Sequence, residues 1–369
     1  MKDIFNGVFK GKNVIVTGHT GFKGSWLSLW LKELGANVTG YALKPPTSPA
    51  LFNILNLKND INSVIGDIRD LNNVKDTFQK CEPQFVFHLA AQPILIESYA
   101  NPKYTYETNV IGTLNVLEAI RNTNSVKVAV IITSDKCYEN MGWTRGYKEN
   151  DAMGGFDPYS SSKGCAELLT KAYRNSYFNN ERFGGNKNVS LASVRAGNVI
   201  GGGDWAKARL IPDCIKALSE GKKIKIRDPR AIRPWQYVLE PLRGYLSLAE
   251  KMFKDGKKYE EAWNFGPSEK NSIKVKEMVE KILGFWGNGE WTDISENTSD
   301  NFHEDKYLKL DSSKACRILG WKPIFNIDEA LKVTVSWYKS YYCKLNNMKE
   351  YTKEQIMEYC KVCKNSECK

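Results

Sequence analysis

The sequence predicts an α/β protein with a doubly wound parallel sheet, followed by a smaller mixed domain. Short apolar runs such as NVIVTG, FVFHLAA and VAVIIT alternate with helix-like segments such as GSWLSLWLKELGA and TLNVLEAIRN. This alternation is typical of βαβ units, because each parallel strand needs a crossover before the next one. Later in the chain the order loosens into short segments with more glycine, proline and tryptophan, which indicates a second, smaller domain.

We therefore expect three regions in the chain. Residues 1–188 form the parallel-sheet domain. Residues 189–345 mainly form the smaller, substrate-binding domain, with some segments returning to the first. Residues 346–369 form a partly flexible tail with a short helix and a loose end. At 369 residues and 42% hydrophobic content, the chain is long enough to bury a sizeable core.

The composition narrows the possible functions. The longest apolar runs are shorter than the roughly 20 residues of a membrane span, and the first residues show no signal-peptide core. We therefore expect a cytoplasmic protein with no membrane partner. The net charge of +11 comes from dispersed lysines and arginines, without the aromatic and basic signature of nucleic-acid binding. A small anionic substrate explains this charge equally well.

The nine cysteines are scattered through the chain, which favours free thiols over a disulfide framework. Cys360 and Cys363 have the spacing of a zinc pair. No second pair or histidine lies near them in the sequence to complete four ligands, so no metal site is expected.

A glycine-rich loop lies between the first predicted strand and helix, in VIVTGHTGFKGSWLSLWL. Glycines at this junction allow a tight turn and let backbone amides approach a pyrophosphate at the helix N-terminus. The position after the first strand favours a Rossmann-like dinucleotide site over a simple turn. His19 can contact the cofactor phosphates or fill the space beside them. The predicted cofactor loop comprises Gly18, His19, Gly21, Phe22 and Gly24.

The end of the second strand bears on the choice of cofactor. An acidic residue there grips the adenosine ribose of NAD, but this chain reads GYALKPP and offers only Tyr41 and Lys44. We expect NAD, with NADP not excluded. Asp67 and Ile68, at the end of the third strand, are candidate adenine contacts. The alternative is that Gly66 and Asp67 simply form a turn.

Tyr159 and Lys163 in DPYSSSKGCAELLTKAY share one face of a predicted helix, which begins at Asp157-Pro158. A lysine ammonium near a phenol lowers the phenol's pKa, so that the phenolate can accept a proton. The alternative is an ordinary surface pair on an amphipathic helix. Ser134 favours the catalytic interpretation, because it ends the VAVIIT strand, where its hydroxyl can face the phenol.

Together, the glycine loop, HLAAQ, ETNVIGT, Ser134 and YSSSK resemble the extended short-chain dehydrogenase/reductase family, over roughly residues 10–345. The resemblance implies hydride-transfer chemistry by the Ser, Tyr and Lys set. It implies that Asn109 helps to hold the sheet and the active-site loop beside the cofactor. The strand end after HLAA is expected to line the cofactor through Leu89, Ala90 and Ala91.

Nucleotide-sugar dehydratases of this family carry an acid and a base directly after the Ser or Thr. The segments TSDKCYEN, MGGFDPYSSSKGCAE, VRAGNVIGGGDWA and IRPWQYVLEPL resemble the CDP-glucose 4,6-dehydratases among them. The resemblance implies conversion of CDP-glucose to CDP-4-keto-6-deoxyglucose and water, by C4 oxidation, elimination across C5 and C6, and hydride return to C6. It also implies a place in deoxysugar synthesis for lipopolysaccharide O-antigen.

Asp135 and Lys136 are the acid and base candidates under this resemblance. Asp135 can protonate the departing 6-hydroxyl if burial raises its pKa. Lys136 can remove the C5 proton only as a neutral amine, and lowering its pKa from about 10.4 to near 7 costs about 4 to 5 kcal/mol. Its alternative role is a cation that stabilises the enolate or attracts a phosphate.

The resemblance also supplies the substrate side and the assembly. Asn198, Arg209 and Arg233 lie in segments that border the nucleotide-sugar diphosphate in related enzymes, and arginine's planar fork suits phosphate. Tyr237 and His303 are candidates to close the pocket. Each of these residues can instead be an ordinary domain-interface residue. A homodimer or tetramer is expected, through the helices after ETNVIGT and YSSSK.

Three rival functions differ from this prediction in what they require. A nucleotide-sugar epimerase of the same fold needs only the Ser, Tyr and Lys set, so Asp135 and Lys136 argue against it. A redox sensor that only binds the dinucleotide commonly lacks the intact Tyr and Lys. A dehydratase for another nucleotide sugar stays open, because no spacing in the sequence identifies the cytosine.

Overall fold

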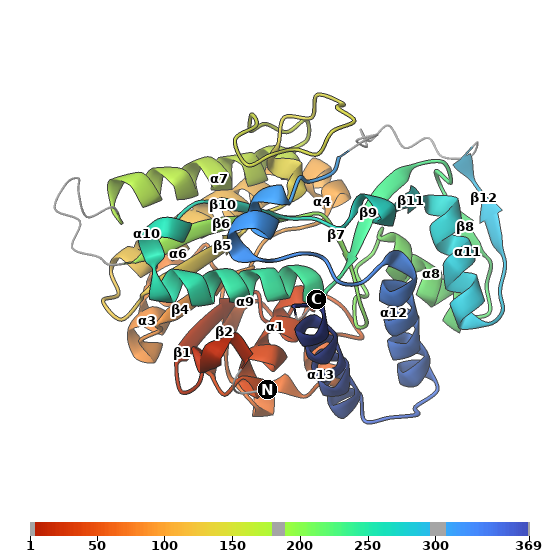
Figure 1. The fold of residues 1–369 in the computed structure, drawn as a ribbon, viewed down its shortest axis with the longest axis horizontal. Helices are drawn as coiled ribbons and strands as arrows, with labels where there is room; N and C mark the ends of the chain where they lie inside the picture. The colour runs from red at the N-terminus through yellow and green to blue at the C-terminus, as the bar shows by residue number, and fades with distance from the viewer. Residues whose placement is uncertain (1–3, 179–188, 296–307, 368–369) are drawn as a thin grey trace.

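A seven-stranded parallel sheet forms the centre of the molecule (Figure 1). The computed structural model describes residues 4–178, 189–295 and 308–367. The strand order is β10-β6-β5-β4-β1-β2-β3, and every neighbouring pair is parallel. The predicted doubly wound, Rossmann-like sheet is confirmed. The strands are β1 (Asn13–Thr17), β2 (Asn37–Ala42), β3 (Asn62–Ile65), β4 (Phe85–His88), β5 (Val128–Ile132), β6 (Ser190–Ala196) and β10 (Ala262–Phe265).

Helices cover both faces of this sheet because its strands are apolar on both sides. In β1, Val14 and Val16 pack into one core and Ile15 into the other, as the alternation of side chains along a strand requires. The first core is closed by α1 (Phe22–Glu33) and α9 (Leu239–Lys254). The second core is closed by α3 (Leu71–Cys81), α6 (Gly112–Arg121) and α7 (Pro158–Ser176).

The smaller part of the molecule lies at the right of Figure 1 and contains two small sheets. One has the order β11-β9-β7, and the other pairs β12 with β8. Its strands are β7 (Asn198–Ile200), β8 (Ile224–Ile226), β9 (Ile232–Tyr237), β11 (Ser272–Lys274) and β12 (Trp291–Asp293). Its helices are α8 (Leu210–Ser219), α11 (Val275–Trp286) and α12 (Ile327–Tyr342).

The expected boundary at residue 188 does not separate two sheets. Strands β6 and β10, together with helix α9, come from residues 189–345 but belong to the large parallel layer. Strand β6 pairs with β5, so the chain completes the large sheet before it enters the smaller part at β7. The returning segments are therefore central to the first core.

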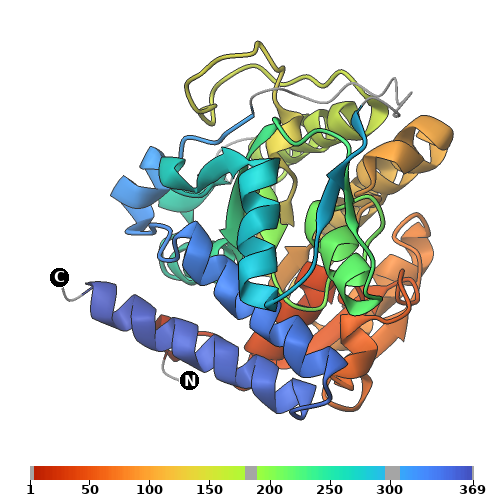
Figure 2. The ribbon, with the colours of Figure 1, turned by 90° about the vertical axis from the view of Figure 1, so that its right-hand side faces the viewer.

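The tail differs from the expected short helix and loose end. Residues Met348–Glu367 form the 20-residue helix α13, which lies along the lower edge of the molecule in Figure 2. Its apolar side, including Ile356 and Tyr359, is buried in the first core. Lys353 pairs with Glu33 of α1 at 3.2 Å. The face formed by positions about four apart explains the docking, since these positions align on one side of a helix.

Short elements complete the described ranges. The short α-helices are α2 (Leu51–Ile54), α4 (Leu95–Ala100), α5 (Pro102–Tyr106) and α10 (Gly256–Tyr259). The 3₁₀ turns are η1 (Ile4–Gly7), η2 (Leu57–Asn59), η4 (Asp135–Cys137) and η5 (Glu269–Asn271), and the π-helical turns are η3 (Glu107–Ile111) and η7 (Ala315–Leu319). Among the described residues, every helix is too short or too polar to cross a lipid bilayer.

Candidate active site

Ser134, Asp135 and Lys136 begin the turn η4 at the carboxyl end of β5. The Ser134 hydroxyl donates to Asp135 Oδ1 at 2.9 Å, and the Lys136 amide donates to Ser134 Oγ at 3.3 Å. Ser134 and Asp135 are buried. Gly197 makes room for the carboxylate, because a Cβ at this position would lie 2.7 Å from Asp135 Oδ2. The turn thus holds an acid beside a hydroxyl inside the protein.

Helix α7 brings Tyr159 to this turn. The helix begins as predicted, with Asp157 accepting a hydrogen bond from the Ser160 amide at 2.8 Å and proline in the first turn. The Tyr159 phenol hydrogen-bonds to Ser134. Burial raises the pKa of Tyr159 and the Asp135 charge adds to this, while the Ser134 bond and the nearby cations oppose it. Ser134 therefore joins the phenol to the Asp135 carboxylate.

Lys163 is buried one helical turn beyond Tyr159. Burial and the neighbouring Lys23 lower the pKa of Lys163 to about 8. Lys23 lies in the first turn of α1, and burial and the Arg209 charge likewise lower its pKa to about 8. Lys23 was not among the site residues predicted from the sequence. Its place inside the glycine loop, in GFKG, is the signal that could have identified it.

The glycine loop has the geometry that a dinucleotide pyrophosphate needs. Gly18 has a φ of +76°, and a Cβ there would lie 2.8 Å from the Ala90 amide nitrogen. A Cβ at Gly24 would lie 2.1 Å from the Gly18 carbonyl oxygen. Gly21, the N-cap of α1, carries no side chain to occupy the first-turn amides. These amides are available to an anion at the positive end of the helix, so the loop fits the phosphates of a dinucleotide.

His19 lies beneath this loop. Its side chain is buried, and its Nε2 is 2.7 Å from Ser63 Oγ on β3. The ring packs edge-on against Phe52 and over Gly40, where a Cβ would lie 2.2 Å from the ring. Burial lowers the pKa of His19 to about 4. The His19 ring is therefore enclosed by protein groups beneath the glycine loop.

The far edge of the site, past β3, contains Asp67 and Ile68. Ile68 is buried, and Asp67 forms a hydrogen-bonded ion pair with Arg69 at 2.6 Å. Tyr41, one of the two candidates at the end of β2, is buried and donates its hydroxyl hydrogen to the Asp67 carbonyl at 3.0 Å. A pocket of about 370 Å³ opens here. Its lining is formed by Asp67, Arg69, Asp70, Glu107 and Ile111.

The segment after β4 is hydrogen-bonded to the end of β1. The amides of Leu89 and Ala90 both donate to Thr17 Oγ1 at 3.1 Å, and Ala91 continues toward Gln92. Asn109, in η3, exchanges hydrogen bonds with the backbone of Gln92 at 2.8 and 3.1 Å. Its amide also donates to Ser162 on α7 at 2.9 Å. Asn109 therefore ties the strand-end loop to the helix that carries Tyr159.

The expected substrate residues lie in different surroundings. Arg209, the N-cap of α8, is paired with Asp204 at 2.9 Å, and its charge acts on Lys23 and Tyr159. Asn198 begins β7 with its side chain exposed.

Arg233 lies on β9 and donates to the Ile232 carbonyl. Tyr237, at the end of β9, is 1% exposed, stacks on Phe325 and donates to Gln355 on α13. This is the ordinary interior role that the sequence left open. His303 lies outside the described residues.

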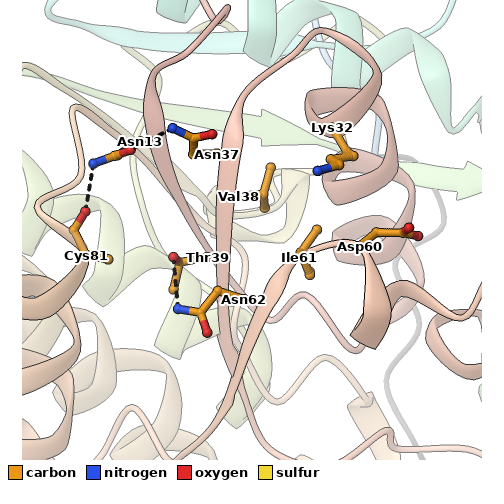
Figure 3. A pocket seen from close by; sticks show the side chains of 9 residues that line it. All are labelled: Asn13, Lys32, Asn37, Val38, Thr39, Asp60, Ile61, Asn62 and Cys81. Atoms are coloured by element: carbon orange, nitrogen blue, oxygen red, sulfur yellow. Dashed lines mark hydrogen bonds between the residues drawn. The ribbon is translucent and has the colours of Figure 1, made fainter.

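A second pocket, of about 290 Å³, lies at the opposite edge of the sheet (Figure 3). It surrounds Asn13, Asn37 and Asn62, the first residues of β1, β2 and β3. The Asn13 amide donates to the Cys81 carbonyl at 3.1 Å and the Asn37 amide donates to Asn13 at 3.2 Å. None of the predicted site residues lines this pocket.

Within the described ranges, His, Cys, Asp and Glu side chains form no group of three that could hold a metal ion. Cys360 and Cys363 lie on the buried side of α13.

The large sheet, the glycine loop and the grouped Ser134, Tyr159 and Lys163 define a short-chain dehydrogenase/reductase architecture. The family described as GDP-mannose 4,6 dehydratase matches residues 15–334. The chain is 49% identical over 352 residues to a CDP-glucose 4,6-dehydratase of Salmonella typhimurium, covering 95% of this chain and 97% of that protein. It is 26% identical to a dTDP-glucose 4,6-dehydratase of Haemophilus influenzae, over 88% and 97% of the two chains. The chain belongs to the GDP-mannose 4,6 dehydratase family.

Solved structures share the fold. An epimerase of Methanothermobacter thermautotrophicus has a TM-score of 0.76 at 25% identity, covering 93% of this chain and 96% of that one. A dTDP-glucose 4,6-dehydratase of Bacillus anthracis, in complex with NAD, has a TM-score of 0.72 at 23% identity, covering 89% and 97%.

Proposed function

We propose that this protein converts CDP-glucose to CDP-4-keto-6-deoxyglucose and water, with NAD as its resident cofactor. The observation that carries the proposal is the turn Ser134–Asp135–Lys136 placed against Tyr159. The Ser, Tyr and Lys set alone would serve an oxidoreductase or an epimerase, whereas the acid and amine on the same turn serve an elimination. The 49% identity to the Salmonella CDP-glucose 4,6-dehydratase supports the choice of CDP-glucose.

The glycine loop would hold the cofactor pyrophosphate on the first-turn amides of α1. The adenine end would lie toward Asp67 and Ile68, and the nicotinamide end toward Tyr159 and Lys163. When bound, NAD accepts a hydride from sugar C4 and returns it to C6. Without an acidic residue at the end of β2, NADP stays an alternative. The solved relative with NAD bound supports NAD.

Tyr159 is the proposed base for the proton of the 4-hydroxyl. Burial raises its pKa, so the phenolate needs the neighbouring cations. Lys163 would supply this help in its charged form, and the charges of Lys136 and Arg209 lower the phenol's pKa in the same direction. Ser134 would hydrogen-bond the same sugar oxygen and keep it in line with the phenol.

Asp135 is the proposed acid for the departing 6-hydroxyl. Asp135 is buried at the turn with its Oδ1 2.9 Å from Ser134 Oγ, and as the acid it would have to carry a proton when the 6-hydroxyl departs. Lys136 is the proposed partner at C5, either as the base or as the cation that stabilises the enolate. Both roles require Lys136 at this end of β5.

Arg209 is the proposed contact for the diphosphate, since its charge already acts on Tyr159 and Lys23 within the site. Asn198 and Arg233, at the start of β7 and on β9, would border the same group. His303 keeps its predicted role in closing the pocket, which depends on residues outside the described ranges.

The assembly we propose is a homodimer, with a tetramer as a further possibility, through α6 and α7. Large apolar side chains are exposed on this side of the sheet: Ile111 is 46% exposed and Leu168 is 57% exposed. Such side chains are typical of a surface that a second copy covers. We place the reaction in the cytoplasm, where cysteines such as Cys137 and Cys214 would stay reduced.

The proposal is tested by incubating the purified protein with CDP-, dTDP-, GDP- or UDP-glucose and either NAD or NADP. We expect loss of one water from CDP-glucose, detected by mass spectrometry, and transfer of deuterium from C4 to C6. Absence of product from CDP-glucose with both cofactors would refute the proposal. A product of unchanged mass would indicate an epimerase instead.

A further inference from the structure

The geometry points to a positioning role for the buried pair Glu167 and Arg195, which we propose holds both ends of the turn that carries Ser134, Asp135 and Lys136. The inference rests on the proposed function of that turn. Neither Glu167 nor Arg195 was among the residues that the sequence singled out, and neither belongs to the proton-transferring set.

Glu167 fixes the beginning of the turn. It lies on α7 one turn beyond Lys163 and two turns beyond Tyr159, on the same helical face. Its Oε1 accepts a hydrogen bond from Thr133 Oγ1 at 2.5 Å. Thr133 directly precedes Ser134, so one carboxylate oxygen connects the helix of the phenol to the residue before the serine.

Arg195 fixes the other end of the turn. Its Nη1 donates to the Tyr138 hydroxyl at 2.6 Å, and Tyr138 directly follows η4. Its Nη2 donates to Glu167 Oε2 at 2.8 Å, and Ser193 donates to the same oxygen at 2.7 Å. The Tyr138 hydroxyl donates onward to Asn264 Oδ1 at 2.8 Å. Glu167 and Arg195 thus join α7 and β6 to the residues on both sides of the turn.

The burial of this pair favours a role in geometry over one in stability. The two side chains are 4% and 3% exposed. Although burial opposes it, Arg195 and the hydrogen bonds hold the pKa of Glu167 below its usual range, so the pair stays ionised. Removing two charges from water offsets most of their attraction, and a buried ion pair is often no more stable than apolar residues of equal volume. A network with fixed donors and acceptors does, however, specify one arrangement of the chain.

The test compares Tyr138→Phe and Glu167→Gln with Tyr173→Phe as a matched control. Tyr138→Phe removes only the hydroxyl that accepts the hydrogen bond from Arg195. Arg195 keeps its hydrogen bond to the Glu149 carbonyl at 3.1 Å. Tyr173, on helix α7 but away from the turn, donates its hydroxyl hydrogen to Glu118 on α6 at 2.7 Å. All three changes preserve side-chain volume.

Amide hydrogen exchange of the protein without substrate is the first readout. We expect exchange in the peptide spanning residues 133–138 to accelerate about tenfold or more in Tyr138→Phe and Glu167→Gln, with β4 and β1 unchanged. Tyr173→Phe should leave this peptide as in the wild type. Equal acceleration throughout the sheet would mean general destabilisation and would overturn the inference, as would unchanged exchange at the turn in both variants.

The second readout separates positioning from binding. In Tyr138→Phe, kcat for CDP-glucose should fall about tenfold while KM stays within about threefold, because misplaced reacting groups slow chemistry more than binding. A rise in KM at constant kcat would contradict the inference. If Glu167→Gln does not fold, Tyr138→Phe alone decides. A wild-type protein without dehydratase activity would refute the proposed function, while the exchange measurement would still decide the positioning role.

Discussion

The strands of the large sheet have carboxyl ends on one side, which we call the carboxyl edge, and amino ends on the other, which we call the amino edge. The two sides differ in the polar groups that they bury. At the carboxyl edge, Ser134, His19 and His88 are buried, and the charge of Lys163 acts on His88. At the amino edge, the amides of Asn13 and Asn37 bond to each other and to the backbone. Only the carboxyl edge faces the positive ends of the crossover helices, so buried polar groups there can be aimed at a ligand. The presence of a pocket at each edge does not by itself distinguish them.

Replacement of Tyr159, at the carboxyl edge, should reduce the dehydration rate more than any other change considered. Tyr159→Phe removes the proposed proton acceptor but keeps the ring, so the dehydration rate should fall by about a factor of 1,000. This loss corresponds to about 4 kcal/mol in the barrier. Initial rates with CDP-glucose and NAD measure it. A variant that keeps a tenth of the wild-type rate would contradict the assignment.

The next effect compares one lysine from each edge. Lys136→Met should slow exchange of the C5 proton with solvent deuterium about 100-fold if Lys136 is the base. Lys32 lines the pocket at the amino edge, and Lys32→Met should change this rate less than twofold. Undiminished exchange in Lys136→Met would rule out Lys136 as the base. Deuterium incorporation at C5 is followed by mass spectrometry.

The carboxyl edge should also make the fold sensitive to acid. Burial, with a smaller contribution from Lys163, lowers the pKa of His88 to about 3, and burial lowers that of His19 to about 4. Each folded-state pKa lies below the unfolded value of about 6.5, so the unfolded state binds more protons between these values. The free energy of unfolding should therefore fall as the pH falls from 6.5 to 4, by on the order of 2 to 3 kcal/mol per histidine.

Urea unfolding at pH 7, 5.5 and 4 tests this expectation. His88 lies 2.7 Å from Thr17 Oγ1 and 3.0 Å from Thr113 Oγ1. His88→Gln retains a group that can reach these hydroxyls but has no charge to gain. The difference in unfolding free energy between the wild type and this variant should shrink toward acid pH. A constant difference across the range would contradict the histidine's contribution.

The smallest effect is expected from Asn62 at the amino edge. Its amide reaches Thr39 Oγ1 at 3.4 Å, and its side chain is exposed. Asn62→Ala should change the free energy of unfolding by less than about 0.5 kcal/mol, as for most surface substitutions, and leave kcat/KM within twofold. A tenfold loss of activity would show that the pocket in Figure 3 contributes to the reaction.

The sequence predicted the elements whose signals are local. The β-branched run that ends at Ser134 and the Tyr159 and Lys163 spacing predicted a strand end and a helix face, and the structure brings them together. Tyr237 shows the limit of this reasoning, because the family resemblance suggested a place in the pocket, while tertiary packing buries its ring. The pair Glu167 and Arg195 had no local signal, since a contact between residues 28 positions apart depends on the fold.

The length and burial of the C-terminal helix were underestimated for a different reason. Charged residues dominate the composition of KEYTKEQIMEYCKVCK, which suggested a solvated end. The buried side includes Met348, Thr352, Ile356, Tyr359 and Cys363, at steps of three and four residues that define one helical face. The period was present in the sequence, but the average polarity concealed it.

The docking of α13 on α1 can take place only late in the synthesis of the chain. Lys353 follows its partner Glu33 by about 320 residues, so at ribosomal rates of roughly 5–20 residues per second the outer side of α1 waits about 15 to 60 seconds for its cover. Trp30 contacts Tyr359 in the finished protein. During this interval the Trp30 ring lacks that contact and can associate with other chains. A nascent chain halted before Met348 would therefore be a substrate for chaperones.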